Sequence, residues 1–82
     1  MSKHSIKVGA TYSNGDFYHH WEVRQVLARG LSCEPDEAPE CVRYKVLAGQ
    51  RRRQNFVCST GEFAAWARHE VLRDENSWRI AL

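Results

Sequence analysis

The stretch "CVRYKVLAGQRRRQNFVCS", residues 41–59, decides the fold that the sequence predicts. Apolar side chains occupy every second position from Val42 to Ala48, with Arg43 and Lys45 on the other face, and this period of two is typical of a half-buried strand. "GQRRR" then turns the chain, and residues 53–58 return it as another strand with Phe56 and Cys58 directed inward. The stretch therefore predicts a β-hairpin whose tip and outer face carry basic side chains.

Residues 6–12 predict a strand that precedes this hairpin. Apolar residues or alanine occupy every second position from Ile6 to Tyr12. The pair Asn14-Gly15 follows, and both residue types tolerate the positive φ of a tight turn. We therefore expect the chain to reverse here and to enter a second strand.

Residues 20–28 are assigned to that second strand, although their pattern is less regular. Trp21 and Val23 share one face of a strand, whereas Val26 falls on the other, so either a bulge intervenes or both faces are partly covered. A helix over residues 16–29 is the alternative. The β-branched and aromatic content and the preceding turn favour the strand.

Residues 60–73 predict an amphipathic helix. Ser59 and Glu62 have the spacing of a capping box, in which each side chain binds a free backbone N–H of the first helical turn. The apolar side chains fall on one stripe, namely Phe63, Ala64, Trp66, Ala67 and Val71. Apolar side chains alternate again at Trp78, Ile80 and Leu82, so we expect the tail over residues 74–82 to dock on the domain.

These segments predict a single α+β domain, a four-stranded antiparallel meander packed by a C-terminal amphipathic helix. An SH3-like small barrel is the alternative, because the same meander forms a barrel when it curls further. The chain has 82 residues and is 43% hydrophobic, which predicts a packed core. A domain of this size has little room for a deep pocket, and this argues against an enzyme.

The cysteine count and the lack of long apolar segments predict a cytoplasmic protein without membrane contact. No apolar run approaches the roughly 20 residues that cross a bilayer, and no secretory signal is recognisable. Cys33, Cys41 and Cys58 are an odd number of cysteines, so reduced thiols are expected. Oxidation of Cys33 and Cys41 to a disulfide is the less favoured reading.

A concentration of basic residues marks the candidate binding site. Between Val42 and Gly61 the chain has five basic side chains and no acid, and they are Arg43, Lys45, Arg51, Arg52 and Arg53. A basic sheet face that leads into a basic tip suits the phosphates of nucleic acid. The alternative is a solvated hairpin tip, since the formal net charge of the whole chain is only +2.

Binding to a protein is the alternative function. Phe17 and Tyr18 follow the first turn, and so small a core does not have room for every aromatic residue. The acidic loop over residues 31–41 and the basic tip give complementary charges. These features predict an adaptor for a protein partner, or a domain that associates with a second copy of itself.

The sequence predicts neither a metal site nor a catalytic site, and no cofactor. The cysteines are eight and seventeen positions apart, whereas zinc ligands come in pairs two to four residues apart. The neighbours His19 and His20 would point to opposite faces of a strand. Hydrolytic chemistry at Cys58 and His69 is a weaker hypothesis, because no motif connects the two residues.

Four blocks of sequence carry a resemblance to known proteins: "VGATYSNG", "HWEVRQVL", "VRYKVLAG" and "CSTGEFAAWARHEV". Their order resembles small proteobacterial proteins that consist of little beyond this one domain, over residues 7–73. More distantly, the aromatic and valine positions resemble compact bacterial domains of unknown function with an SH3-like barrel. Neither resemblance implies a substrate, a cofactor or a catalytic set. The long acidic loop and the length of the helix depart from the barrel and favour the meander.

Overall fold

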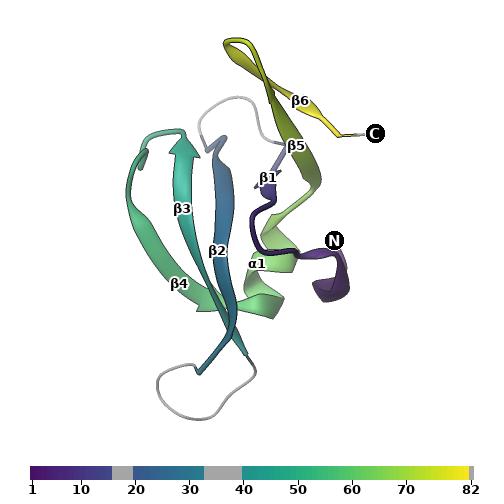
Figure 1. Ribbon diagram of the computed structural model, residues 1–82, viewed down its shortest axis with the longest axis vertical. Helices are drawn as coiled ribbons and strands as arrows, with labels where there is room; N and C mark the ends of the chain where they lie inside the picture. The colour runs from purple at the N-terminus through teal and green to yellow at the C-terminus, as the bar shows by residue number, and fades with distance from the viewer. Residues whose placement is uncertain (16–19, 33–39, 82) are drawn as a thin grey trace.

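The computed structural model describes residues 1–15, 20–32 and 40–81, which form a six-stranded antiparallel sheet and one α-helix. The elements are η1 (Lys3–Ser5, a 3-10 turn), β1 (Thr11–Ser13), β2 (Val23–Leu31), β3 (Cys41–Ala48), β4 (Asn55–Ser59), α1 (Thr60–Trp66), β5 (His69–Asp74) and β6 (Ser77–Ile80). The strand order is β4-β3-β2-β1-β5-β6 (Figure 1). The predicted α+β class is confirmed. The predicted number of four strands is wrong, because the sheet has six.

The meander from β1 to β4 is confirmed, and residues 23–28 form a strand rather than the alternative helix, although β2 begins and ends three residues later than predicted. β2 pairs with β3 in antiparallel register, with Val26 opposite Tyr44. The register shifts between Val23 and Arg24, so a bulge explains how Val23 and Val26 are both fully buried. β3 pairs in turn with β4, with Tyr44 opposite Phe56.

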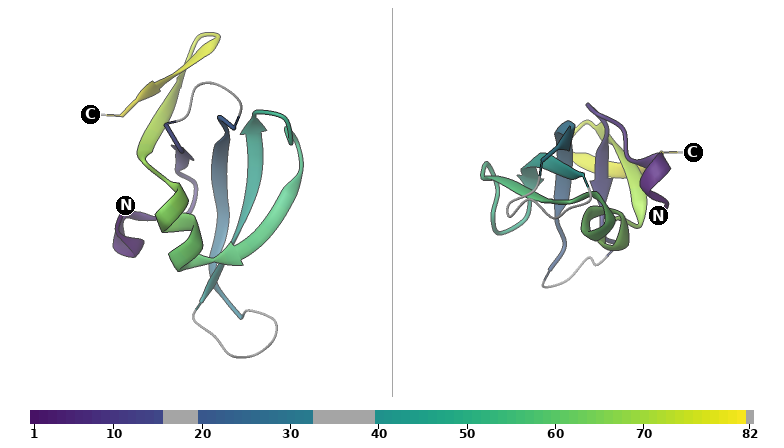
Figure 2. Two further views of the ribbon diagram at one scale, coloured as in Figure 1. Left: turned by 180° about the vertical axis from the view of Figure 1, so that it is seen from behind. Right: turned by 90° about the horizontal axis from the view of Figure 1, so that it is seen from below.

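The core lies between the sheet and α1, which covers one side of the strands (Figure 2). It is built around aromatic rings: Phe63 of α1 lies 5.7 Å from Tyr12 and 5.4 Å from Tyr44, between ring centroids, in edge-on arrangements. The hydroxyl of the buried Tyr12 donates to the backbone oxygen of Ser5 and accepts from the backbone N–H of Lys7, at 2.8 Å in each case. These bonds join η1 and the segment after it to the sheet.

The helix is shorter than predicted, because β5 takes the residues from His69 onward. α1 begins as expected, with the Ser59 hydroxyl accepting from the backbone N–H of Glu62 at 3.0 Å. It ends at Trp66, and Ala67 has extended backbone angles. β5 then pairs with β1 on one side and with β6 on the other. Val71 would also have fitted the apolar face of a longer helix. The backbone hydrogen bonds that β5 makes with its two neighbouring strands favour the strand instead.

The two ends of the predicted meander also differ from expectation. Of the strand predicted over residues 6–12, only β1 forms, because Gly9 has a φ of +90° and breaks the extended backbone. Ile6 is nevertheless buried, as its alternation indicated. The predicted docking tail contains β6, which forms with β5 a hairpin that projects from one end of the molecule (Figure 1).

Candidate nucleic-acid interface

The turn between β3 and β4 places Arg51 in one environment and Arg52 and Arg53 in another. The backbone closes through hydrogen bonds from the N–H of Arg53 to the oxygen of Val46, at 2.8 Å, and from the N–H of Gln54 to the oxygen of Arg51, at 3.1 Å. Gly49, with a φ of +116°, and Arg53, with a φ of +76°, both occupy the left-handed region. The side chain of Arg51 lines one cavity, whereas those of Arg52 and Arg53 line another.

Arg52 and Arg53 belong to a cavity of about 350 Å³ that we name the basic pocket. It is lined by Lys45, Val46, Leu47, Arg52, Arg53 and Arg73. Four of these six side chains are cations, and no acid lines the cavity within the part of the chain that the structure describes. Four like charges around one cavity produce a positive potential that attracts anions.

Three of the five predicted contact residues line the basic pocket, and a fourth lies on the same strand as one of them. Lys45 lines the basic pocket together with Arg52 and Arg53. Arg43 lies two positions before Lys45 on β3, so it shares a face of the strand with Lys45, and it is exposed. Among the described residues, no ion pair involves any of these four side chains.

Arg51 has a different role, because its guanidinium binds the carboxylate of Glu22. Its Nε and Nη2 donate to the two oxygens of Glu22 at 3.0 and 2.9 Å, a bidentate pair. The same guanidinium lies 4.2 Å from the ring centroid of Phe56. A side chain with these partners is not free to bind a phosphate.

Glu22, Arg24 and Arg51 form what we name the inner cluster. Arg24 donates through Nε to Glu22 at 2.5 Å, and its guanidinium lies 3.7 Å from the ring centroid of Trp66 and 4.5 Å from that of Tyr44. The side chains of Glu22 and Arg24 are only 9% and 11% exposed. The cluster thus places a nearly buried carboxylate between two arginines.

The two arginines of the inner cluster lower the pKa of Glu22. Burial by itself raises the pKa of this carboxyl, but the hydrogen bonds from Arg51 and Arg24 outweigh burial and hold the pKa below its usual value of 4.5. The same pairing raises the pKa of Arg51. Glu22 is therefore a carboxylate at neutral pH, and it neutralises one of the two arginines.

Sequence reasoning missed Glu22, Arg24 and Arg73. Arg73 was placed on a helix, but it lies on β5 and lines the basic pocket beside residues of β3 and of the turn. No local pattern indicated Glu22 and Arg24 as partners, because Glu22 precedes β2 and a register shift falls between Val23 and Arg24. The predicted partner residues Phe17 and Tyr18 lie outside the residues that the structure describes.

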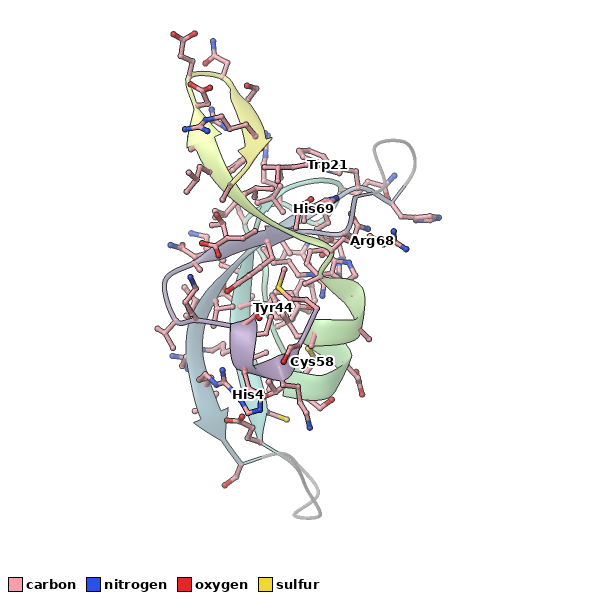
Figure 3. The ribbon with its side chains drawn as sticks, turned by 90° about the vertical axis from the view of Figure 1, so that its right-hand side faces the viewer. His4, Trp21, Tyr44, Cys58, Arg68 and His69 are labelled. Carbon is pink, nitrogen blue, oxygen red and sulfur yellow. The ribbon has the colours of Figure 1, made fainter. Side chains whose placement is uncertain are left out.

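The hypothesis of hydrolysis at Cys58 and His69 finds no support in their positions. Cys58 lies on β4, just before α1 begins, and His69 lies on β5, beyond the other end of α1 (Figure 3). Burial also raises the pKa of the Cys58 thiol, which disfavours the reactive thiolate. Within residues 1–15, 20–32 and 40–81, no group of three His, Cys, Asp or Glu side chains is placed to hold a metal ion.

The expectation of reduced thiols is wrong for Cys41, which is disulfide-bonded, whereas Cys58 is free. The other cysteine of the less favoured reading, Cys33, lies outside the described residues. A disulfide is unusual in a reducing compartment, so the argument from thiols no longer supports the predicted cytoplasmic location. No helix in the described part of the chain is long and apolar enough to cross a membrane.

Comparison with protein-family models, with curated proteins and with solved structures finds no match to this chain. The resemblance to small proteobacterial proteins and to SH3-like domains therefore stays a prediction. The argument for a function depends on the geometry of the basic pocket.

Proposed function

We propose that this domain is a non-catalytic module that binds nucleic acid through its phosphates at the basic pocket. The observation that supports this proposal is the set of four cations around one cavity of about 350 Å³, with no described acid among them. Arg43 extends the positive surface along β3. We leave Arg51 out of the contact set, because Glu22 already binds its guanidinium.

A titration of labelled nucleic acid against salt tests this proposal. Fluorescence anisotropy is recorded with single-stranded RNA and with duplex DNA, for the wild type and for a variant with Arg52, Arg53 and Arg73 changed to alanine. Each phosphate contact contributes roughly 0.7–0.9 to the slope of log K against log salt, so the variant should lose about 2–3 units of slope.

A matched variant separates a site from a general charge effect. Changing Lys3, Lys7 and Arg79 to alanine also removes three positive charges, so both variants lower the formal net charge from +2 to −1. These three side chains lie outside the basic pocket. We expect the matched variant to keep most of the affinity. An equal loss in both variants, or binding that does not depend on salt, would contradict the proposal.

Self-association is the second candidate function, and the hairpin of β5 and β6 favours it. β6 is one edge of the sheet, and the side chains of Leu72 and Ile80 are 44% and 46% exposed. An unpaired edge with exposed apolar side chains favours pairing with a second strand. Sedimentation equilibrium tests this candidate. A concentration-dependent dimer that Ile80→Lys abolishes would support it, and a monomer at all concentrations would reject it.

A further inference from the structure

A different cavity is lined by Gln50 and Arg51 of the β3–β4 turn together with Glu22 and Arg24 of the inner cluster. It has a volume of about 330 Å³, and its walls include Trp21, Glu22, Arg24, Gln50, Arg51 and Trp66. This volume lies at the lower end of the range of small-molecule sites, about 300–1,000 Å³. The proposed function does not use this cavity.

Arg24 gives the cavity a specific binding group. Its Nε is used by Glu22, and contacts with Trp66 and Tyr44 hold the guanidinium in place. Its two Nη groups make no hydrogen bond with any residue that the structure describes, yet neither nitrogen is fully buried. The end-on edge of a guanidinium, with two parallel N–H donors, matches the two oxygens of a carboxylate.

The charge and the walls of the cavity restrict the ligand further. Two arginines and one glutamate leave the inner cluster with a single positive charge, which a monoanion neutralises. A dianion such as a phosphate monoester would place excess negative charge next to Glu22, at a cost that increases in a partly buried site. Trp21 and Trp66 supply apolar wall area for a flat hydrocarbon group.

We propose that this cavity binds a small monocarboxylate with a flat apolar body, whose carboxylate lies on the Nη edge of Arg24. The carboxylate belongs to a free acid or to the C-terminus of a short peptide, since the two present the same group.

The tryptophan side chains report binding directly. Two of the three tryptophans, Trp21 and Trp66, line the cavity, whereas Trp78 lies on β6 and serves as an internal reference. Phenylacetate is titrated into ¹⁵N-labelled protein and the three indole N–H signals are followed by NMR. We expect the signals of Trp21 and Trp66 to shift in a saturable way while that of Trp78 stays in place. Phenylacetamide, which has the same shape without the charge, should bind at least tenfold more weakly.

Variants and further ligands complete the test. Arg24→Lys keeps the charge but loses the pair of Nη donors, and should weaken phenylacetate binding at least tenfold. Arg79→Ala, outside the cavity, should leave it unchanged. If Arg24→Lys fails to fold, the comparison of phenylacetate with phenylacetamide on the wild type decides.

A peptide ending in phenylalanine shows whether a free acid or a peptide C-terminus binds more tightly, and either result supports a site for a carboxylate. Equal binding of acid and amide, tighter binding of phenyl phosphate, or a shift of Trp78 alone would overturn the proposal.

Discussion

Arg51 and Arg52 are neighbours in the sequence, but their side chains lie in different surroundings in the structure. Arg51 forms a bidentate pair with Glu22 and contacts the ring of Phe56, whereas Arg52 is exposed and lines a cavity with three other cations. The inner cluster therefore contains charges that neutralise one another, and the basic pocket contains charges that do not. The difference teaches that a run of arginines does not define one surface, because a turn directs successive side chains to different sides.

The largest expected effect comes from removing the carboxylate of the inner cluster. Glu22→Gln leaves Arg24, which is 11% exposed, without its anionic partner. Loss of one member of a buried ion pair costs about 3–5 kcal/mol, so we expect the free energy of unfolding to fall by about 3 kcal/mol, measured by urea denaturation. Glu40→Gln is the control. Its ion pair with Arg29 is more exposed, at 39% for Glu40, so its loss should lower the free energy of unfolding far less than the loss of Glu22. An equal decrease in the free energy of unfolding in both variants would show that the inner cluster stabilises the fold no more than an exposed ion pair does.

Gly49 directly follows β3 and lies against the backbone of Trp21 and Glu22, and its replacement should have the next largest effect. A Cβ at this position would lie 2.7 Å from the backbone oxygen of Trp21, and the φ of +116° is unfavourable for any side chain. We expect Gly49→Ala to cost about 2 kcal/mol, measured by thermal denaturation. Gly61→Ala is the matched control, because a Cβ there meets no atom within 4 Å and α1 favours alanine. Its stability should be equal to that of the wild type or slightly higher. A Gly49→Ala variant as stable as the Gly61→Ala variant would mean that the turn adapts.

The pH dependence of stability should distinguish the inner cluster from the basic pocket. The pKa of Glu22 is lower in the folded protein than its usual value of 4.5, so the unfolded chain binds this proton more tightly. The stabilisation by Glu22 is therefore complete above about pH 4.5 and is lost as the pH falls through the folded-state pKa. We expect the difference in melting temperature between wild type and Glu22→Gln to narrow as the pH falls from 6 to 2.5. The Glu40→Gln variant should keep the acid sensitivity that Glu22 causes. A difference that stays constant over this range would contradict the pairing.

Much of the fold was predictable because its strands have local signals. The alternation around Tyr44 identified β3 and its hairpin, and the irregular position of Val26 indicated a bulge that the structure contains. The end of the helix was not predictable, since Val71 fits the helical stripe as well as it fits β5. What decides between them is the pairing of β5 with β1, residues about 60 positions apart, and no local pattern records such a partner.

The position of the candidate site was predictable from the sequence, but the directions of its arginine side chains were not. Charge clustering indicated the turn, and Arg52 and Arg53 lie in the basic pocket. The inward direction of Arg51 depends on Glu22, which is 29 residues away in the sequence. Arg73 joins the pocket only because β5 is a strand. Both facts are tertiary, so the sequence suggested a basic surface without showing which arginines are free.

The smallest expected effect on stability belongs to the basic pocket, and it completes the comparison. Arg52 and Arg73 are exposed and make no described ion pair. Changing both to alanine therefore breaks no described ion pair and loses only a long contact, 5.3 Å, between the guanidinium of Arg73 and the ring centroid of Trp78. It also relieves repulsion among four like charges. We expect the free energy of unfolding to change by less than about 0.5 kcal/mol. At low salt any change should be a gain, and 0.3 M sodium chloride should remove it because salt screens exposed charges. Lys7→Ala, which removes the exposed ion pair with Glu70, should show no such gain. A loss of more than 1 kcal/mol in the double variant would mean that the basic pocket stabilises the fold, and its charges would then need no ligand to explain them.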